Sequence, residues 1–460
     1  MENNVSMEKL VAYCKDNGFV FQGSEVYGGL ANSWDYGPVG VLMLNNVKAA
    51  WWKKYVQQSK YNVGLDAGIL MNPKVWEASG HLANFGDPLT DCKECKTRHR
   101  ADKLIEEQSR GEVSVGGWSF EKMMDYITEH KIKCPKCGKF NYTPIRQFKL
   151  MLKTFLGVLE DDASTVYLRP ETAQGEFVNF KNVQRSARKN LPFGIAQIGK
   201  AFRNEITPGN FIFRTREFEQ MENQFFCRPD ESAKWFDYYK AFAHDFLTNL
   251  NISKDKLRFR EHPKDELAHY CRRAVDVEYN FPFGWGELWG THDRTDFDVK
   301  NHQKFSSVNM EYFDPTTNEK LFPYCVESSV GANRMMLAFL SAAYKEETLE
   351  NGEIRVVLKL HPALSPYKVA ILPLIKKRHS EKCDEVFGLL SENFSITYDE
   401  SGSIGKRYRR QDEIGTPYCI TIDDETLEKG TVTVRERDTM KQIVLKLDEV
   451  KNFIEDKLKF

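Results

Sequence analysis

Two stretches far apart in the chain carry charged and aromatic side chains in patterns that suit a nucleotide site. The first begins with Phe202-Arg203-Asn204-Glu205, turns at Pro208-Gly209 and resumes as Arg214-Thr215-Arg216-Glu217-Phe218-Glu219-Gln220-Met221-Glu222. The second is Glu327-Ser328-Ser329-Val330-Gly331-Ala332-Asn333-Arg334, which leads into an apolar run. Clustered charges are costly to bury unless they are paired, so these stretches favour an anionic, planar ligand.

The first stretch is predicted to form a β-hairpin, because apolar runs flank its Pro-Gly turn. Side chains alternate between the faces of a strand, so Arg203 and Glu205 are expected on one face. The same rule predicts a second set on one face: Arg214, Arg216, Phe218, Gln220 and Glu222. A solvated hairpin with exposed Arg–Glu pairs is the competing interpretation. It does not explain why the second stretch also ends Gly-x-x-Arg before an apolar helix.

Together the two stretches resemble the second and third signature motifs of class II aminoacyl-tRNA synthetases. The third motif departs from the usual pattern, since Gly331 is the one glycine kept before Arg334. Further segments resemble the homodimeric glycyl-tRNA synthetases of class IIa: Trp34-Asp35-Tyr36-Gly37-Pro38, Trp76-Glu77-Ala78-Ser79-Gly80-His81, Arg169-Pro170-Glu171-Thr172-Ala173-Gln174-Gly175, Asp265-Glu266-Leu267-Ala268-His269-Tyr270 and Phe283-Gly284-Trp285-Gly286-Glu287-Leu288. With the C-terminal region, the resemblance spans nearly the whole chain.

This resemblance implies a ligase that uses ATP and Mg²⁺ to form glycyl-adenylate and then charges the terminal adenosine 3′-hydroxyl of tRNA(Gly). Arg203, on the α-phosphate, and Arg334, on adenine and the γ-phosphate, are the implied catalytic residues. Glu287 is implied as the Mg²⁺ carboxylate. The implied ATP-binding set is Arg203, Asn204, Glu205, Phe213, Arg214, Thr215, Arg216, Glu217, Phe218, Glu287, Leu288, Gly331, Ala332, Asn333 and Arg334.

Glycine offers an ammonium group and no side chain, so its recognition requires carboxylates. The resemblance implies a glycine-binding set of Arg100, Glu171, Phe218, Glu219, Gln220, Met221, Glu222, Glu327, Ser328, Ser329, Val330 and Gly331. Taken alone, Glu171 also suits a helix start after Pro170. His81 and His269 receive no catalytic role, since a lone histidine is more often a hydrogen-bonded core or rim residue.

The cysteines include two pairs with the spacing of metal ligands. Cys92-x-x-Cys95 and Cys134-x-x-Cys137 are separated by 38 residues and could give four thiolates to one tetrahedral zinc ion. Two unrelated pairs, or a redox pair, remain as alternatives. The other six are predicted to be buried as small apolar residues: Cys14, Cys227, Cys271, Cys325, Cys383 and Cys419.

Length and composition predict a multidomain globular protein. A chain of 460 residues exceeds one typical domain, and it has no apolar run long enough for a membrane span. Residues 1–4 begin no signal peptide pattern, which together with many unpaired cysteines predicts a cytoplasmic protein. The net charge of −1 does not by itself favour nucleic acid, so RNA contacts require a local basic face.

Changes in composition divide the chain into parts. With these divisions, the resemblance implies an α/β (α+β) fold with a class II antiparallel-sheet catalytic core at 1–90 and 144–350. A Cys-rich insertion at 91–143 interrupts this core, and a mixed-sheet anticodon-binding domain is implied at 365–460. A charged bridge, 345–354, joins core and C-terminal domain. A helix at 45–56 and a strand at 61–70 resemble the first class II motif, which forms the homodimer interface in that family.

The C-terminal part is predicted to alternate strands (369–372, 396–398 and 418–422) with helices (381–393 and 404–412). Its basic helix carries Lys406, Arg407, Arg409 and Arg410 around Tyr408. The cations could meet RNA phosphates and the tyrosine could stack on an anticodon base, although a solvated basic helix is the alternative.

Two other functions share parts of this pattern. A non-catalytic paralogue with a synthetase fold would be expected to lose the motif arginines and Glu287, all of which are present. A class IIa enzyme for histidine, threonine or proline would lack the combination of the 169–175 and 283–288 segments.

Overall fold

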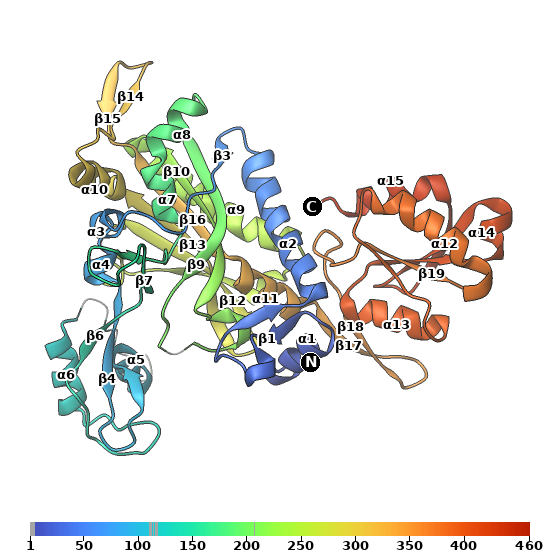
Figure 1. Ribbon diagram of the computed structural model, residues 1–460, viewed down its shortest axis with the longest axis horizontal. Coiled ribbons are helices and arrows are strands. Elements are labelled where there is room, and N and C mark those ends of the chain that lie inside the picture. The colour runs from blue at the N-terminus through green and yellow to red at the C-terminus, as the bar shows by residue number, and fades with distance from the viewer. Residues whose placement is uncertain (1–4, 110–112, 114, 116–117, 207) are drawn as a thin grey trace.

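The computed structural model describes residues 5–109, 113, 115, 118–206 and 208–460. Residues 1–4, on which the prediction about a signal peptide depends, lie outside the described part. A large N-terminal body and a smaller C-terminal body lie side by side, and a small module hangs from the far side of the large one (Figure 1). Within the described residues, no helix is long and apolar enough to cross a membrane.

The large body is built on a seven-stranded sheet in the order β11-β12-β13-β16-β10-β9-β3. Its neighbours pair antiparallel except for β3, which is parallel to β9. This confirms the predicted antiparallel core. The strands are β3 (Asn62–Gly64), β9 (Phe193–Phe202), β10 (Glu217–Cys227), β11 (Leu257–Glu261), β12 (Arg273–Phe281), β13 (Gly284–Thr295) and β16 (Tyr324–Gly331).

The predicted hairpin is present, with Phe202 of β9 paired to Glu217 of β10. The predicted strand at 61–70 is wrong in extent, because β3 ends at Gly64. A buried side chain explains the early end: Arg169 donates from Nη1 to the Ala67 carbonyl at 2.8 Å. Leu65 still donates its backbone N–H to the Ala196 carbonyl of β9 at 2.9 Å, but at Ala67 the backbone bonds to the Arg169 side chain and no longer to the ladder.

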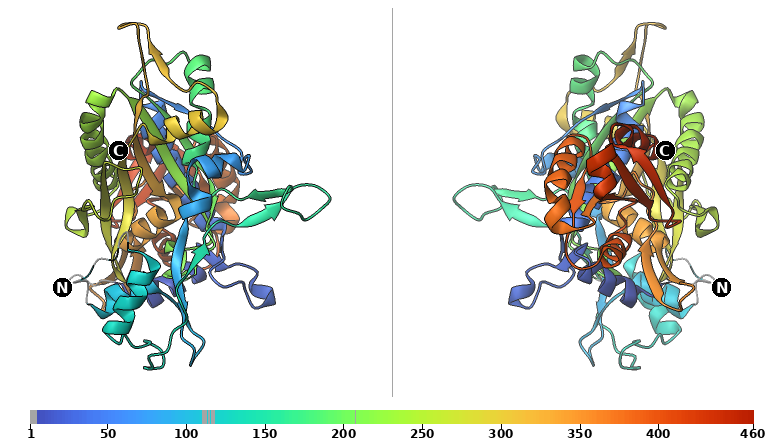
Figure 2. Two further views of the ribbon diagram at one scale, coloured as in Figure 1. Left: turned by 90° about the vertical axis from the view of Figure 1, so that its left-hand side faces the viewer. Right: turned by 90° about the vertical axis from the view of Figure 1, so that its right-hand side faces the viewer.

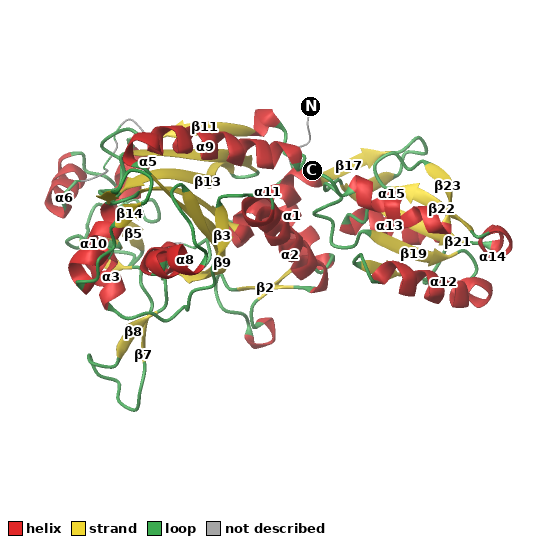
Figure 3. Cartoon of the chain, turned by 90° about the horizontal axis from the view of Figure 1, so that it is seen from above, coloured by secondary structure: helices red, strands yellow, loops and turns green. Residues whose placement is uncertain are grey.

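Helices cover both faces of this sheet (Figure 3). Adjacent residues of β10 point to opposite faces: Phe225 lies in the main core and Phe226 in a second one. The main core joins the sheet to α1 (Met7–Asp16), α2 (Pro38–Trp52), α9 (Ser232–Asn249) and α11 (Ala332–Ala343). The second joins it to α7 (Ala173–Val178), α8 (Phe180–Ser186) and α10 (Phe297–Ser306).

The predicted helix at 45–56 starts too late. Helix α2 begins at Pro38, because proline has a preset φ and suits the first helical position after Gly37. Its last turn continues as a short π-helix, Lys53–Gln57.

The large body also carries small two-stranded hairpins. They are β1 (Val20–Gln22) with β2 (Trp34–Tyr36), β7 (Lys153–Phe155) with β8 (Thr165–Tyr167), β14 (Tyr312–Asp314) with β15 (Glu319–Leu321), and β17 (Tyr344–Thr348) with β18 (Ile354–Leu358). The last pair shows that the charged bridge expected at 345–354 includes strand residues, and the Tyr344 and Leu358 at its ends are paired and buried.

The hanging module contains a three-stranded sheet in the order β5-β4-β6. Its elements are β4 (Gly86–Asp91), β5 (Arg98–Arg100), α5 (Ala101–Gln108), α6 (Phe120–Glu129) and β6 (Arg146–Lys149). Leu104 and Ile105 pack with Met123 and Ile127 in a core of its own. Pairing of β4 with β6 closes the module at 86 and 149, slightly outside the expected insertion at 91–143.

The C-terminal body has a five-stranded sheet in the order β20-β19-β21-β22-β23, and its mixed pairing confirms the predicted mixed sheet. Strand β19 is parallel to β20 and β21, and the remaining pairs are antiparallel. Helices α12 and α15 pack on one face and α13 on the other (Figure 1). The elements are β19 (Val369–Pro373), α12 (Lys376–Ser391), β20 (Ile396–Tyr398), α13 (Ile404–Ile414), β21 (Tyr418–Ile422), α14 (Asp424–Lys429), β22 (Thr431–Glu436), β23 (Gln442–Lys446) and α15 (Val450–Lys457).

A buried ionic cluster joins the two bodies. Arg355 of β18 donates from Nε to Asp412 of α13 at 2.9 Å, and Arg435 of β22 donates to both oxygens of the same carboxylate. All three side chains are buried. Each of these buried charges needs its oppositely charged partner, because it has lost contact with water. The ion pairs therefore join the two bodies in addition to the chain connection.

Candidate functional site

A pocket of about 180 Å³ opens on the sheet face near β10, β13 and β16. It gathers side chains from both stretches that the sequence singled out. Its lining consists of Glu171, Arg203, Glu205, Ile212, Phe213, Arg214, Thr215, Phe218, Gln220, Glu222, Tyr270, Glu287, Leu288, His292, Arg294, Glu327, Ser329, Val330, Gly331, Asn333 and Arg334. The predicted convergence of the two stretches is therefore what the fold produces.

One end of the pocket, which we call the cationic end, is formed by Arg203, Arg214 and Arg334 with two aromatic rings. The Arg203 guanidinium carbon lies 5.4 Å from the ring centroid of Phe218, and its Nε donates to the Pro170 carbonyl at 3.0 Å. These contacts leave the remaining guanidinium donors available to an anion.

Arg334 lies in the first turn of α11, directly after the end of β16. Its Nε donates to the Phe213 carbonyl at 3.0 Å, and its guanidinium carbon lies 4.5 Å from the Phe213 ring centroid. Its Nη1 lies 3.3 Å from Oε2 of Glu287. Desolvation would raise the pKa of Glu287, but the charges of Arg334, His292 and Arg203 outweigh it and hold the pKa below its usual value.

Asn333 and Arg214 complete the cationic end. Asn333 accepts from the Glu219 backbone N–H at 2.7 Å and donates to the hydroxyl of Tyr36, which fixes the start of α11 against β10. Arg214 lies 3.9 Å from Glu205 Oε2 and is one-third exposed. So loose an ion pair leaves Arg214 free to contact a ligand phosphate.

The other end, the acidic end, holds three carboxylates: Glu171, Glu222 and Glu327. Glu222 accepts from the Ser329 hydroxyl at 2.6 Å, the Gln220 amide at 3.0 Å and the Thr172 backbone at 3.1 Å. The strand register explains the contact between Glu222 and Ser329, because these residues of β10 and β16 are paired.

Glu327 is held as an ionised carboxylate. His292 Nδ1 lies 2.8 Å from Oε1, and Oε2 accepts from Arg294 at 3.0 Å and from Gln224 at 2.7 Å. Burial alone would raise the pKa of Glu327, but Arg294 and His292 lower it to about 2.

Glu222 behaves in the opposite way. Burial, then the negative charges of Glu327 and Glu171, raise its pKa to about 7. The acidic end therefore holds more negative charge than its own cations neutralise, and a cationic ligand group would relieve the repulsion.

Eight residues of the sequence-based set do not line the pocket: Arg100, Asn204, Arg216, Glu217, Glu219, Met221, Ser328 and Ala332. Alternation accounts for most of those on strands. Glu217 pairs with Lys200 and Glu219 with Lys48. Met221 is buried in the main core, and Ser328 contacts the Tyr55 hydroxyl on the face opposite the pocket.

The other four lie in the surrounding structure. Arg216 donates to the carbonyls of Ala31 and Glu205, because β10 begins only at Glu217 and the predicted alternation does not reach back to it. Asn204 donates its backbone N–H to Leu150. Ala332 is buried in the main core. Arg100 pairs with Asp87 and Asp102 inside the hanging module.

Four lining residues were missed by sequence reasoning: Ile212, Tyr270, His292 and Arg294. A β-bulge explains the miss on β13. Glu278 pairs with Glu287 but Val277 with Trp289, so one extra residue shifts the alternation. Strict alternation from Glu287 would place His292 and Arg294 on the wrong face. Counting from the core residue Trp289 would have found them.

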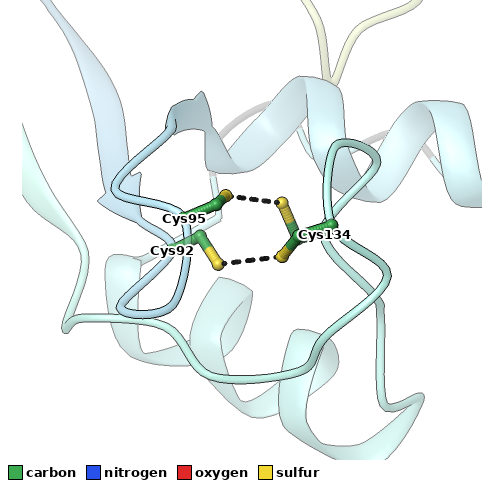
Figure 4. Close-up of side chains that lie close together, drawn as sticks. Cys92, Cys95 and Cys134 are labelled. Atoms are coloured by element: carbon green, nitrogen blue, oxygen red, sulfur yellow. Dashed lines mark hydrogen bonds between the residues drawn. The ribbon is translucent and has the colours of Figure 1, made fainter.

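The four cysteines of the hanging module converge, and Figure 4 shows Cys92, Cys95 and Cys134 close together. Their Sγ atoms lie within 4.8 Å of one another, with Cys92–Cys137 at 3.6 Å and Cys95–Cys134 at 3.7 Å. A tetrahedral ion with Zn–S bonds of about 2.3 Å separates its sulfurs by about 3.8 Å. The donor set and spacing therefore fit one zinc ion. The other six cysteines form no disulfide, and five of them are buried.

The basic stretch of α13 is less available than its sequence predicts. Arg407 is buried and donates to the carbonyls of Pro373 and Gly402. Arg410 donates twice to Asp399, and Arg409 lies 3.7 Å from Asp412. Tyr408 packs against the sheet with its hydroxyl on Thr421. The expectation of a free stacking ring at Tyr408 is wrong, because the ring forms part of the helix–sheet contact.

Two family models match separate parts of the chain. Residues 158–344 match the tRNA synthetase class II core domain (G, H, P, S and T), and residues 368–457 match the anticodon binding domain. The first match lies within the large body and the second within the C-terminal body.

Relatives match over nearly the full length. The glycine–tRNA ligase of Clostridium kluyveri is 60% identical over 99% of both chains, and that of Clostridium perfringens is 61% identical over 99% of both. That of Acetivibrio thermocellus is 59% identical over 100% of both. A crystal structure of prolyl-tRNA synthetase from Cryptosporidium parvum, complexed with L-proline and AMP, shares the fold. Its TM-score is 0.61 at 13% identity, covering 98% of this chain and 78% of that one.

Proposed function

The chain belongs to the glycine–tRNA ligase family, and from that premise we propose that its pocket joins glycine to ATP and passes the glycyl group to tRNA(Gly). The observation that carries the proposal is the opposite character of the two ends of the pocket. Three arginines and two aromatic rings suit a nucleotide polyphosphate, and three carboxylates suit an ammonium group. One molecule seated at each end would bring a carboxylate and a phosphate together.

In the first step, the glycine carboxylate attacks the α-phosphorus of ATP, and glycyl-adenylate and pyrophosphate are formed. Arg203 would hold the α-phosphate and stabilise the charge that develops there. Phe218 would lie beneath adenine, and Arg334 would cover its other face and reach the γ-phosphate with Arg214. The site would act mainly by positioning and charge stabilisation.

Glycine is held at the acidic end in this proposal, with its ammonium group near Glu171, Glu222, Glu327 and Ser329. These side chains are already bonded to their neighbours and have little freedom to move. Adding the methyl group of alanine to a rigid pocket typically costs about 1–3 kcal/mol. Selection would therefore combine charge recognition with lack of space.

Glu287 would supply a carboxylate to Mg²⁺, which takes few protein ligands and keeps phosphate oxygens and waters. Its lowered pKa and its position at the cationic end fit that role. The ion would neutralise phosphate charge when bound.

In the second step, the terminal adenosine 3′-hydroxyl of tRNA(Gly) attacks the adenylate carbonyl and AMP leaves. The C-terminal body would read the anticodon, in keeping with its matched domain model. Its buried ionic link to the large body would hold the two tRNA contacts at a fixed separation.

A homodimer is part of the proposal. Two loops project from the same side of the large body (Figure 2). Both carry exposed apolar side chains. Val26 and Tyr27 are 89% and 90% exposed in one, and Val158 is 100% exposed in the other. Exposed apolar groups in clusters mark protein contacts. The partner proposed for them is a second copy of this chain, which a sedimentation measurement would detect.

We further propose a cytoplasmic location, since free cysteines are typical of a reducing compartment. The four converging cysteines would hold structural zinc, one ion per chain. Cys134→Ser should release it and increase proteolysis within 86–149, whereas Cys383→Ser, at a buried cysteine of the C-terminal body, should keep it. Full metal content in the first variant would exclude this site.

The experiment that tests the function is ATP–pyrophosphate exchange with each of the twenty amino acids. We expect exchange with glycine alone, followed by charging of tRNA(Gly). A paralogue without catalytic activity would show no exchange, and exchange with proline, threonine or histidine would identify a different ligase.

A further inference from the structure

One short turn of the chain reaches residues at both ends of the pocket. It is the turn Ser79–Phe85, which contains α4 (His81–Asn84) and leads directly into β4. The turn lies outside the pocket lining, and none of the roles proposed above uses it. Its two aromatic side chains point to different functional residues.

His81 contacts Glu171 at the acidic end. Its Nε2 lies 3.4 Å from Glu171 Oε2, and its Nδ1 lies 2.7 Å from the Ser79 hydroxyl. When that hydroxyl donates to Nδ1, the imidazole proton is on Nε2 and faces the carboxylate. The other oxygen of Glu171 accepts from Gln174 at 3.0 Å, so the carboxylate is held from both sides.

Phe85 contacts Arg203 at the cationic end. Its ring centroid lies 5.4 Å from the guanidinium carbon, which is also the distance to the ring of Phe218. The carbonyl of Phe85 accepts from the Leu150 N–H, and the carbonyl of Leu150 accepts from the Asn204 N–H. Both chain segments at the base of the hanging module therefore support the segment that carries Arg203.

The two contacts belong to one unit. The His81 and Phe85 rings are 5.2 Å apart, and the Phe85 N–H donates to the His81 carbonyl at 3.1 Å. His81 also meets the buried ring of Trp76 edge-on at 5.6 Å. A turn packed in this way can fix both side chains without touching a substrate.

We propose that the turn Ser79–Phe85 is a positioning element of the adenylation site. His81 orients Glu171 toward the ammonium group of glycine, and Phe85 holds Arg203 in place for the α-phosphate. The inference rests on the proposed function for the roles of Glu171 and Arg203. Because β4 begins at Gly86, the placement of the hanging module is also transmitted to Arg203 through this turn.

The test separates the two contacts by steady-state pyrophosphate exchange with the full chain. His81→Ala should raise KM for glycine about ten-fold, the size of a lost hydrogen bond to a charged group, and leave KM for ATP unchanged. His81→Gln should recover part of the loss, because its amide nitrogen reaches toward the position of Nε2. Phe85→Leu should lower kcat or raise KM for ATP about three- to ten-fold, without changing KM for glycine.

Matched controls lie on the hanging module, away from the pocket: His130→Ala and Phe120→Leu, both at exposed positions of or next to α6. Neither should change any constant. Equal shifts of both KM values in His81→Ala and Phe85→Leu, together with a lower Tm, would show a general structural role and overturn the inference.

Glu171→Gln distinguishes the inference from the function on which it rests. If it raises KM for glycine, His81→Ala in that background should add little, because the two act through one contact. A full additional ten-fold effect would overturn the coupling. If Glu171→Gln leaves KM for glycine unchanged, the glycine assignment and the inference both fail. If Glu171→Gln raises it and His81→Ala does not, the inference alone fails.

Discussion

The arginines of the pocket and the arginines of α13 look alike in sequence and differ in the structure. In the pocket, Arg203 and Arg334 contact aromatic rings and backbone carbonyls and keep donors for a ligand. In α13, the buried Arg407 donates to the Pro373 and Gly402 carbonyls, and Arg410 is bound to Asp399. The first group faces a cavity, and the second is bonded within the fold.

The difference teaches that a basic run predicts a binding surface only where its acceptors lie outside the chain. Arg355 and Asp412 carry the same lesson across the junction of the two bodies, because each is fully buried and is the partner of the other. Deletion of 365–460 would take Asp412 away from Arg355. Deleting the C-terminal body would therefore leave a buried charge without its partner in the large body, so point variants are the better way to test what the C-terminal body does.

The largest effect is expected from breaking the junction. Asp412→Ala removes the acceptor of Arg355 and Arg435 and should destabilise the protein by about 3–5 kcal/mol, as for other buried pairs that lose one partner. In a thermal unfolding experiment, the first transition should occur at a lower temperature. Glu428→Ala, at an exposed position of α14, is the matched control. Equal transitions in the two variants would contradict the buried cluster.

Arg203→Ala should remove activity and leave stability unchanged, whereas Asp412→Ala should lower stability. A lost contact to charge that develops in the transition state typically costs about 10²–10³ in rate. Pyrophosphate exchange should fall by that factor while the unfolding transition stays in place. Arg185→Ala, on the exposed side of α8, controls for loss of a surface cation. Near-normal exchange in Arg203→Ala would end its assignment to the α-phosphate.

The acidic end predicts a pH dependence. Burial and two neighbouring carboxylates raise the pKa of Glu222 to about 7, and an ammonium ligand favours its ionised form. Below that pH, Glu222 must lose its proton before glycine binds. KM for glycine should therefore fall as pH rises toward 7, by at most about ten-fold per pH unit, and then level off.

Glu222→Gln supplies the comparison, because an amide does not titrate. Its KM for glycine should be higher and should lose this component of the pH dependence. A wild-type KM that is flat from pH 5.5 to 8 would contradict the raised pKa of Glu222.

Local alternation and turn residues anticipated the sheet hairpin and the strands of the mixed C-terminal sheet. The convergence of both charged stretches was implied by their resemblance to the class II motifs. Sequence patterns failed where a distant contact decides the outcome. Ala67, inside the predicted strand at 61–70, bonds through its carbonyl to Arg169, which is far along the chain. His292 was missed because a bulge on β13 depends on the pairing with β12. The acceptors of Arg407, which are the Pro373 and Gly402 carbonyls, and of Arg410, which is the Asp399 carboxylate, also lie outside α13.

The smallest effect is expected in α13, where two neighbouring basic residues of one helix can be compared. Lys406 is exposed, whereas the neighbouring Arg407 is buried. If α13 faces RNA, Lys406→Ala should raise KM for tRNA(Gly) a few-fold and reduce the salt dependence by about one counterion. Pyrophosphate exchange should not change, because the pocket lies in the other body. Arg407→Ala should instead lower Tm, because the buried Pro373 carbonyl loses this donor. A loss of tRNA affinity in Arg407→Ala at unchanged Tm, with normal charging by Lys406→Ala, would reverse the two roles and show that the buried arginine becomes available when RNA binds.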